Sequence, residues 1–378
     1  AHNHPFCSEP VRFSRMDEHG FDDVVPYMLE SLQHPIYGAV VLGGKSNVNG
    51  AVWVHQPSHR SAITRFDSLG PISRRDFTTS GSLQVVPTEP TDSAAMVDRQ
   101  VRAFGRDGQR RLSELHVAVV GVGGIGSIVV QQLAHLGVRR FVLIDPDVVE
   151  TTNLNRLVGA ALDDAHRSHP KVQVAARLVR SLHPEAEVLP LQRPVFHLDA
   201  IAAVAAADLV VCGTHDAASR FAVNEMSLAY MRPYLDLGTE IDGRGGSLQS
   251  IGGRFTFLFP GSGCLLCSRA IDPFDAAAQL RPPTAMRHDL DRGYVRGSSE
   301  PSPSVLPLNA AVVSLAMNEV LAWATGWRPP RAQKLYDGAD GSVCDLLFER
   351  DPNCMACAEL LGRGDLANIA QRYTAWAE

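Results

Sequence analysis

Apolar strand patterns and helical patterns alternate along the middle of the chain. The run HVAVV at 116–120 is apolar throughout, and SIVVQQLAHLG at 127–137 carries its apolar residues at helical spacing. The alternation continues with a strand pattern at 139–147, a helical pattern at 169–188 and a strand pattern at 207–216. Strands that alternate with helices at this spacing predict an α/β fold with a mostly parallel, doubly wound sheet.

Weaker patterns precede this region. Residues 21–33 predict a helix that Pro26 interrupts, and YGAVVLGG at 37–44 and GAVWVHQ at 50–56 predict short strands. Residues 68–95 are rich in Gly, Pro, Ser and Thr, a composition typical of a linker. We therefore expect a small α+β domain at the N-terminus, followed by a linker and then the larger domain.

These patterns set the expected domain boundaries. The N-terminal domain is predicted at 1–67, the linker at 68–95 and the larger domain at 96–378. Within the larger domain, residues 270–305 show no convincing period and predict a long excursion, which in a compact domain is usually functional or disordered. Residues 306–326 then predict an apolar helix.

Composition narrows the class of protein. Of the 378 residues, 45% are hydrophobic and 20% are charged, which is ordinary for a globular protein. The net charge of −6 argues against a general nucleic-acid binder, because such proteins usually present a basic face. No apolar run approaches the roughly 20 residues that span a bilayer, and no signal peptide precedes the start. We expect a cytoplasmic protein without a nucleic-acid or membrane partner.

A glycine-rich turn separates the strand pattern at 116–120 from the helix that follows it. The turn contains four glycines, which are Gly121, Gly123, Gly124 and Gly126. Glycine lets the backbone approach a phosphate closely, and the helix N-terminus offers free N–H groups. Asp145 follows about 20 positions later, where it could hold a ribose hydroxyl. The pattern predicts a Rossmann-like nucleotide site, and by itself it fits a nicotinamide cofactor as well as ATP.

Residues beyond Asp145 favour ATP. Asn153 and Arg156 lie in ETTNLNR, and Lys171 begins the next predicted helix. Hydride transfer creates no phosphate charge, so an NAD-dependent enzyme needs no arginine and lysine at this place. Attack of a carboxylate on the α-phosphate of ATP does build up negative charge, which guanidinium, ammonium and magnesium ions stabilise. Asp216, at the end of a predicted strand, is placed to hold magnesium or to orient the nucleotide.

Several segments together resemble the ThiF/MoeB/ubiquitin-activating (E1-like) adenylyltransferase family. They are GVGGIGS, LIDPDVVETTNLNR, HPKVQVA, CGTHDAASRFAVN and two CxxC pairs, spread over residues 97–360. The resemblance implies that the enzyme adenylates the C-terminal glycine carboxylate of a ubiquitin-like or sulfur-carrier protein. It also implies which residues bind ATP and magnesium, namely Asp145, Asn153, Arg156, Lys171 and Asp216.

The same family carries an arginine upstream of a G-x-x-G-Q segment, and this arginine reaches the active site of the partner subunit. Arg99 in RQVRAFGRDGQ resembles it, within a predicted helix and turn at 99–115. Because the segment is shorter here, Arg102 is the alternative. If either arginine acts in trans, the protein must be at least a homodimer.

Four of the seven cysteines form two CxxC pairs, Cys264 with Cys267 and Cys354 with Cys357. Two such pairs supply enough thiolates for a closed, structural tetrahedral zinc site, and a redox-active CxxC is the alternative. An odd cysteine count in a chain of this length also suits a metal site in a reducing compartment better than a disulfide framework.

The remaining cysteines indicate how the reaction would proceed. A thioester-forming cysteine would be expected in the excursion, but residues 268–343 contain no cysteine. Cys212 lies at a strand end and is predicted in the core, and we assign no role to Cys344. The resemblance to MoeB-type members therefore implies adenylation without a thioester, with the acyl-adenylate passed to a sulfur donor or another nucleophile.

The first residues, AHNHPFCSEPVRFSRMD, fit an HxHP motif followed by SxxD. Two imidazoles and a carboxylate can hold one zinc ion and leave a position for water, and a serine can support an oxyanion. The motif resembles that of the JAMM (JAB/MPN) metalloproteases, which implies His2, His4 and Asp17 as zinc ligands and Ser14 as the oxyanion helper. The alternatives are a tag remnant or histidines that cap a turn.

The general base of the JAMM family is a glutamate that lies well before the HxHP motif, and the chain begins directly at the motif. We therefore expect residues 1–67 to form a partial JAMM domain that cannot act unaided. Either a separate N-terminal fragment completes this domain, or the chain is part of a longer gene product.

The leading hypothesis is ATP-dependent adenylation of the C-terminal carboxylate of a ubiquitin-like or sulfur-carrier protein, coupled to a JAMM-type processing domain. Its cofactors are ATP, magnesium and zinc. One alternative is adenylation of a peptide or small carboxylate, as in microcin-type relatives. The others are an NAD-dependent oxidoreductase and a non-catalytic scaffold with a vestigial metal site.

Overall fold

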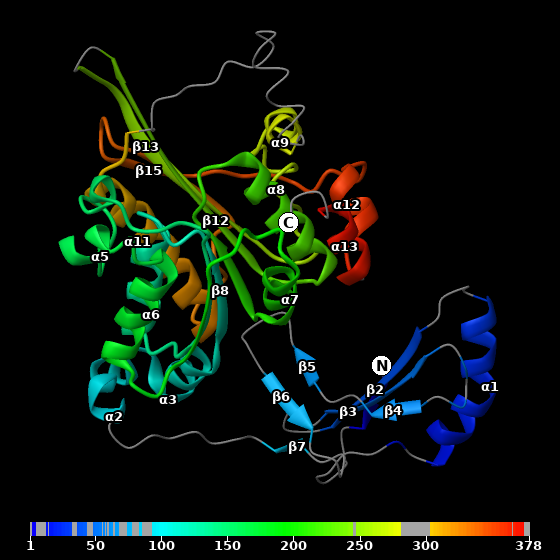
Figure 1. Cartoon of the computed structure of the whole chain (residues 1–378). Coiled ribbons are helices and arrows are strands. Elements are labelled where there is room, and N and C mark those ends of the chain that lie inside the picture. Colours follow the sequence, from blue (N-terminus) through cyan, green and yellow to red (C-terminus); the bar gives the residue numbers. More distant parts are fainter. Residues whose placement is uncertain are drawn as a thin grey trace. The chain divides into compact units, whose positions relative to one another are not determined.

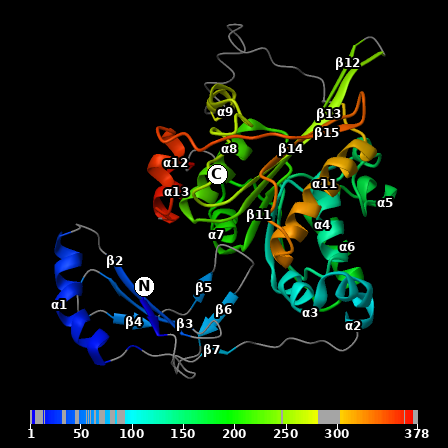
Figure 2. The same cartoon turned by 180° about the vertical axis from the view of Figure 1, so that it is seen from behind.

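The computed structural model describes most of the chain. The described residues are 2–4, 13, 15–31, 36–43, 48–54, 56, 58, 60–62, 65–67, 74–77, 83–84, 93–244, 247–280, 303–364 and 366–373. The chain divides into two compact units, residues 1–94 and 95–378, and each has its own hydrophobic core. Figures 1 and 2 show the chain from opposite sides.

The N-terminal unit contains a small sheet and a long helix. The sheet has the order β1-β2-β3-β4, in which β1 and β2 are parallel and the other pairs antiparallel. Its elements are β1 (His2–His4), α1 (Arg15–Ser31), β2 (Ile36–Gly43), β3 (Val48–Val54) and β4 (Arg60–Ala62). A second sheet contains β5 (Arg65–Asp67), β6 (Arg74–Phe77) and β7 (Leu83–Gln84). β6 and β7 lie within the segment whose composition predicts a linker.

Helix α1 is continuous, so the interruption predicted at Pro26 is wrong. The missing donor of Pro26 is offset by packing, because Val25 is buried against a core that contains Ala39, Ala51 and Trp53. The start of α1 is fastened to β4 by an ion pair, in which Arg60 donates to both oxygens of Glu18 at 2.5 and 3.0 Å.

The larger unit is built on an eight-stranded sheet with the order β10-β9-β8-β11-β12-β13-β14-β15. Its strands are β8 (His116–Val120), β9 (Arg140–Ile144), β10 (Glu187–Leu191), β11 (Leu209–Cys212), β12 (Tyr234–Arg244), β13 (Ser247–Leu258), β14 (Gln333–Asp337) and β15 (Ser342–Asp345). The pairs from β10 to β12 are parallel, and those from β12 to β15 are antiparallel. The predicted α/β, mostly parallel and doubly wound sheet is confirmed.

Helices cover both faces of this sheet (Figures 1 and 2). Those that pack together on one face are α3 (Asp98–Glu114), α4 (Gly126–His135), α6 (Lys171–Leu182) and α11 (Leu306–Thr325). Those on the other face are α7 (Leu198–Ala206), α8 (Ala217–Ala229), α9 (Pro273–Gln279), α12 (Met355–Leu360) and α13 (Leu366–Arg372). The short elements α2 (Ser93–Met96), η2 (Thr151–Asn153) and α5 (Leu162–His166) complete the described helices. The two helical layers bury both faces of the sheet. In such folds ligands bind at the carboxyl ends of the parallel strands.

Helix α11 corrects one expectation from the sequence. It is long and apolar enough to cross a bilayer by length and composition, so the prediction that no apolar run reaches that length is wrong. The helix lies in the core, where 56% of its most apolar window is buried. Val312, Val313 and Ala316 are among its fully buried residues. Its apolar composition therefore reflects packing against the sheet and α3.

Candidate active site

The backbone of the glycine turn leaves no room for a side chain at three of its four glycines. Gly121 has a φ of +79°, and a Cβ added there would lie 2.7 Å from Thr214 Cγ2. A Cβ on Gly126 would lie 1.9 Å from the carbonyl oxygen of Gly121, and one on Gly124 would lie 2.8 Å from Asn309 Nδ2. Around Gly123, by contrast, no atom lies within 4 Å of the added Cβ. Three of the four glycines thus close the turn, and Gly123 leaves open space where a ligand could approach.

We expect Gly126→Ala to destabilise the fold and Gly123→Ala to leave its stability unchanged. The methyl group at Gly126 meets backbone, which cannot move aside, so the loss should reach or exceed the roughly 1–3 kcal/mol typical of overpacking. Urea unfolding of both variants measures the difference. Equal midpoints for the two variants would show that the turn has a different conformation.

Asp145 follows β9 and braces the glycine turn from within. Its Oδ2 accepts a hydrogen bond from Val122 N at 2.7 Å, and its Oδ1 accepts one from Asp147 N at 2.9 Å. Burial raises the pKa of this carboxyl, while the hydrogen bond from Asp147 and the charge of Lys171 act in the opposite direction. Asp145 therefore fixes the turn relative to the end of β9, and its predicted contact with ribose stays a prediction.

Lys171 and Asp147 form an ion pair at the same edge of the sheet. Lys171 Nζ lies 2.8 Å from Asp147 Oδ2, and Lys171 N donates to Asp147 O at 3.0 Å. The side chain of Asp147 is 61% exposed, whereas that of Lys171 is 13% exposed. The lysine thus points toward the segment after β9, and its predicted contact with phosphate stays a prediction. Sequence reasoning missed Asp147, although the DPD spacing placed it two residues after Asp145.

A buried aspartate shapes the segment that leads into Lys171. Asp164 accepts hydrogen bonds from Arg177 Nη1 and Nη2 at 2.8 and 2.6 Å, and its Oδ1 lies 2.8 Å from His169 Nδ1. These bonds from Arg177 hold the pKa of Asp164 well below its ordinary value of 3.8. Asp164 therefore ties α5 to α6 and fixes where α6 begins.

We expect Asp164→Asn to lower the free energy of unfolding at pH 7 by about 1–3 kcal/mol, because it weakens the charge-assisted hydrogen bonds that the buried carboxylate accepts from Arg177, whose side chain is 54% exposed. Asp163→Asn is the matched control, since Asp163 makes only an exposed i,i+4 pair with Arg167. The pKa of Asp164 is lowered by folding, so its contribution is complete above pH 3.8 and is lost as the pH falls toward the lowered value. Denaturation measured from pH 7 down to below pH 3 should therefore show a constant difference between the wild type and Asp164→Asn above pH 3.8, and a difference that shrinks only below it.

Arg156 lies beside the glycine turn. Its Nη1 donates to Thr152 O at 2.7 Å and to Asn155 Oδ1 at 2.9 Å. Its Cγ and Cδ would lie 3.1 Å from a Cβ on Gly124, so the side chain passes directly over the turn. Asn153 belongs to the short helix η2, where its Oδ1 accepts from Glu150 N at 3.2 Å. The structure thus places Arg156 beside the glycine turn, and its predicted contact with phosphate stays a prediction.

Asn309 is a second polar residue at the turn, and sequence reasoning missed it. It is 1% exposed within α11, and its Oδ1 accepts from Thr239 Oγ1 at 2.9 Å. Its Nδ2 donates to Ser304 Oγ at 3.2 Å. The apolar pattern of α11 hides this asparagine, because nothing in the sequence indicates that α11 begins next to the glycine turn.

The structure places Asp216 at the N-cap of α8, directly after β11. Its Oδ1 accepts from Ser219 N at 2.6 Å, and its side chain is half-buried. The residue therefore caps a helix at the carboxyl edge of the sheet. Its predicted role with magnesium stays a prediction.

Arg99 and Arg102 are both exposed in the first turns of α3. Arg102 pairs with Asp98 at 2.8 Å on the same helix. Two glutamines hold α3 in place, since Gln100 and Gln109 donate to the carbonyl oxygens of His135 and Leu136 at 2.7 and 2.9 Å. Arg99 thus extends from a fixed helix into solvent, which suits the predicted contact with a partner subunit.

The four CxxC cysteines form one cluster. Their sulfur atoms all lie within 4.8 Å of one another, with Cys264 Sγ 3.6 Å from Cys354 Sγ and Cys267 Sγ 3.7 Å from Cys357 Sγ. Zinc–sulfur bonds of 2.3 Å in a tetrahedron place the sulfurs roughly 3.8 Å apart. The cluster therefore fits a four-coordinate zinc ion, which would join the loop after β13 to the C-terminal segment.

Cys212 is fully buried beside Thr214, as predicted for a core residue. Burial raises the pKa of its thiol to about 11, and the charge of Asp236 acts in the same direction. A thiol that stays protonated is a poor nucleophile. Cys344 is exposed on β15.

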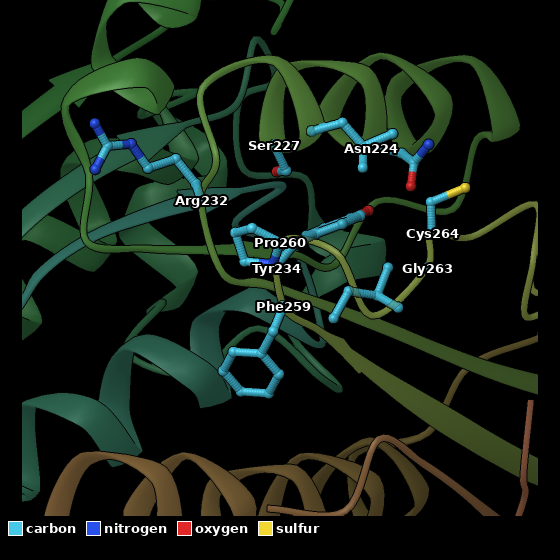
Figure 3. Close-up of a pocket in the computed structure, with 10 residues that line it drawn as sticks. Asn224, Ser227, Arg232, Tyr234, Phe259, Pro260, Gly263 and Cys264 are labelled. Carbon is cyan, nitrogen blue, oxygen red and sulfur yellow. The ribbon is translucent and has the colours of Figure 1, made fainter. Parts of the chain in front are cut away.

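A small internal pocket lies behind the first CxxC pair. Figure 3 shows Asn224 and Ser227 of α8 facing Pro260, Gly263 and Cys264 of the loop. Asn224 Oδ1 accepts from Leu265 N at 2.9 Å, between the two cysteines. Helix α8 thus holds the first pair of the cysteine cluster in place.

The N-terminal histidines lie on β1, where His2 pairs with Val41 and His4 with Gly43. Asp17 is in the first turn of α1. Ser14 lies outside the described residues.

A doubly wound sheet with a glycine turn between its first strand and helix is the architecture of nucleotide-binding α/β proteins. Residues 97–356 match the ThiF family, and the chain belongs to this family. The SAMP-activating enzyme E1 of Haloferax volcanii is 34% identical over 179 residues, which cover 46% of this chain and 62% of that protein. The adenylyltransferase and sulfurtransferase MOCS3 of Bos taurus is 30% identical over 294 residues, or 74% of this chain and 58% of that protein. The chain therefore spans about three fifths of the length of these relatives, 62% and 58%.

A bacterial relative is covered more completely. The sulfur carrier protein ThiS adenylyltransferase of Escherichia coli is 31% identical over 254 residues, which cover 66% of this chain and 89% of that protein. Among solved structures, E. coli MccB with MccA-N7isoASN matches with a TM-score of 0.57 and 21% identity, over 72% of this chain and 76% of that one. At this identity the likeness shows the fold alone.

Proposed function

We propose that the chain catalyses ATP-dependent adenylation of the C-terminal carboxylate of a ubiquitin-like or sulfur-carrier protein. The observation that carries the proposal is the place of Arg156 over the glycine turn, with Lys171 paired to Asp147 in the segment after the neighbouring strand β9. The names of two relatives, the SAMP-activating enzyme E1 and the sulfur carrier protein ThiS adenylyltransferase, agree with it.

In the proposed reaction the carboxylate oxygen attacks the α-phosphorus of ATP. A bond forms between this oxygen and phosphorus, and the bond to the bridging oxygen breaks, so pyrophosphate leaves with the electron pair. The amides of the glycine turn hold phosphate oxygens, and Arg156 and Lys171 offset the charge that builds up. Asp216 would hold magnesium, whose charge balances that of the pyrophosphate, and Asn153 and Asp145 would orient the nucleotide.

No step through a cysteine thioester is needed in this proposal. The cysteines outside the zinc cluster that the structure describes are buried Cys212 and Cys344 on β15, far along the sheet from β11. We infer that the acyl-adenylate passes directly to a sulfur donor or another nucleophile.

The test is ATP–pyrophosphate exchange with candidate carriers that end in Gly-Gly. We expect exchange that requires both magnesium and the terminal carboxylate, so a carrier with an amidated C-terminus is the matched control. ATP binding without exchange for any carrier would overturn the proposal. Tight NADH binding without ATP binding would favour an oxidoreductase instead, and adenylated peptides in a mass-spectrometric screen would favour a microcin-type substrate.

The proposal includes a homodimer in which Arg99 reaches the partner's site. We expect Arg99→Ala and Arg156→Ala homodimers to be inactive separately and to regain activity when mixed, because one mixed site then carries both arginines. Up to about one quarter of the wild-type exchange rate should return if subunits mix freely and one intact site functions alone. Recovery with Arg102→Ala instead of Arg99→Ala would assign the role to Arg102, and no recovery with either would contradict action in trans.

We further propose that His2, His4 and Asp17 are ligands of a JAMM-type zinc site, with Ser14 as oxyanion helper. The membership of both histidines in β1 and the place of Asp17 in the first turn of α1 support it. Such a domain would process the same carriers once a segment with the family's glutamate is supplied. Zinc analysis should then give two ions per chain, and His2→Ala/His4→Ala should give one.

A further inference from the structure

Helix α8 is held along its length by the segment that runs out of the first CxxC pair. Two turns into the helix, Asn224 accepts from Leu265 N at 2.9 Å. One turn earlier, Arg220 Nη2 donates to Ala270 O at 3.3 Å. At the start of the helix, Gln279 Oε1 accepts from the amides of Ala217 and Ala218 at 2.7 and 3.1 Å. The same helix begins at Asp216 and packs through Leu228 on the cysteine cluster.

An ion pair in the core ties this arrangement to the sheet. Arg220 Nε donates to Asp236 Oδ1 at 2.9 Å, and its Nη2 donates to Oδ2. Asp236 is fully buried on β12, where it pairs in register with Cys212 at the carboxyl end of β11. Tyr234 OH donates to the same carboxylate at 3.1 Å. The pair thus joins the first turn of α8 to the edge of the sheet that carries the proposed active site.

A second arginine acts on the same segment. Arg254 of β13 donates through Nη2 to Ala270 O, which also accepts from Arg220. Ala270 lies three residues after Cys267. The carbonyl of Ala270, just after the cysteine pair, is therefore held by two guanidinium groups. One belongs to Arg220 of α8, which pairs with Asp236 of β12, and the other to Arg254 of the adjacent strand β13.

Stability alone does not explain this arrangement. A buried ion pair loses its hydration, and replacing it by apolar residues of similar volume is often neutral or stabilising. What the pair supplies is geometry, because a bidentate arginine fixes direction as well as distance.

We propose that the Arg220–Asp236 pair positions Asp216 and the segment after Cys267 as one unit, so that zinc binding at the four cysteines and the geometry of the adenylation site are coupled. The part that concerns Asp216 rests on the proposed function. Arg220 and Asp236 are positioning residues in this scheme, since neither contacts a substrate. In this scheme zinc fixes Cys264 and Cys267, and the short segment after Cys267 fixes the position of Ala270. Arg220, which donates to Ala270 O, passes that position on to the first turn of α8.

The test compares hydrogen–deuterium exchange of residues 217–224 in the full chain before and after zinc removal by a chelator. In the wild type we expect zinc removal to raise exchange there at least tenfold. In Arg220→Met/Tyr234→Phe/Asp236→Leu, which replaces the ion pair and the tyrosine that donates to it by apolar residues, hydrogen–deuterium exchange should be similar with and without zinc. Wild-type exchange that changes less than twofold, or a wild type that binds no zinc, would overturn the proposal.

The matched control is Glu319→Leu/Arg328→Met, which removes another buried ion pair, between α11 and the residues after it. This variant should respond to zinc removal as the wild type does. If the triple variant fails to fold, Arg220→Lys is used instead. It keeps the positive charge but loses the two-pronged guanidinium contact with Asp236, so zinc removal should raise deuterium exchange less than in the wild type. If the control variant also no longer responded to zinc removal, the loss of any buried ion pair would have the same effect, and the proposal would be contradicted.

Activity separates this inference from the proposed function. Where ATP–pyrophosphate exchange is measurable, the triple variant should require about tenfold more magnesium than the wild type for the half-maximal rate of that reaction. Its melting temperature should stay close to that of the wild type. If no carrier supports pyrophosphate exchange in the wild type, the proposed function fails, while the deuterium experiment still decides whether the pair couples α8 to the cysteine cluster.

Discussion

Replacing Arg156 by alanine should lower the rate of ATP–pyrophosphate exchange by about 100- to 1000-fold, because one donor to a developing anion typically contributes this much. The guanidinium contacts Thr152 O and Asn155 Oδ1, both on the surface beside the glycine turn. Its loss removes charge at the phosphate without emptying the core. The melting temperature should therefore change little, and the effect should fall mainly on kcat.

Two further variants sharpen the result. Arg167→Ala removes an exposed arginine that pairs only with Asp163 on the same helix, so exchange should stay close to the wild-type rate. Arg156→Lys keeps the charge and loses the planar fork, so its rate should lie between those of the wild type and Arg156→Ala. An Arg156→Ala protein with wild-type exchange would place the phosphate elsewhere on the sheet.

Removing two ligands of the cysteine cluster should have the largest effect on stability. We expect Cys354→Ser/Cys357→Ser to lose the bound zinc and to melt on the order of 10 °C lower, since a structural zinc ion contributes several kcal/mol to folding. The physical reason is that the cluster connects the loop after β13 to α12. Differential scanning fluorimetry with zinc analysis measures both quantities.

Cys344→Ser is the control, because Cys344 is exposed on β15 and lies outside the cluster. It should keep both its zinc and its melting temperature. Should the double variant retain zinc at one ion per chain, or melt at the wild-type temperature, the cluster would not be a structural zinc site.

Periodicity predicted the parallel half of the sheet because each strand there is a short apolar run followed by an amphipathic helix. HVAVV became β8 with the predicted bounds, and the helix predicted at 127–137 became α4 (Gly126–His135). The antiparallel half was not predicted, since β13 to β15 contain exposed polar residues and β13 (Ser247–Leu258) pairs with β14 (Gln333–Asp337), far along the chain. Helix α1 shows the opposite error, where tertiary packing kept a helix that Pro26 was expected to interrupt.

For the site, motif spacing identified the residues that lie in sequence next to the glycine turn or to a strand end. Arg156 and Lys171 were found in this way, and the structure brings both to the carboxyl edge. Asn309 was not found, because its neighbourhood depends on how α11 approaches the turn. Asp236 was missed for a similar reason. Its burial in strand β12 makes sense only once the fold brings Arg220 of α8 next to it, and the sequence does not show this contact.

The two CxxC pairs illustrate when spacing is sufficient. Their 90-residue separation says nothing of distance, yet four cysteines in matched pairs have few uses other than metal binding. The structure places the four sulfur atoms at tetrahedral spacing. The HxHP and SxxD residues have no comparable outcome, and their role stays a prediction.

The central claim is that this chain transfers AMP to the C-terminal carboxylate of a carrier protein. Intact mass spectrometry of the carrier, after incubation with the chain, ATP and magnesium and with pyrophosphatase to prevent reversal, tests it most directly. We predict a carrier heavier by one AMP group, absent with the amidated carrier and with Arg156→Ala. Phosphate formed from released pyrophosphate without any AMP on the carrier, or AMP on the amidated carrier, would contradict the account.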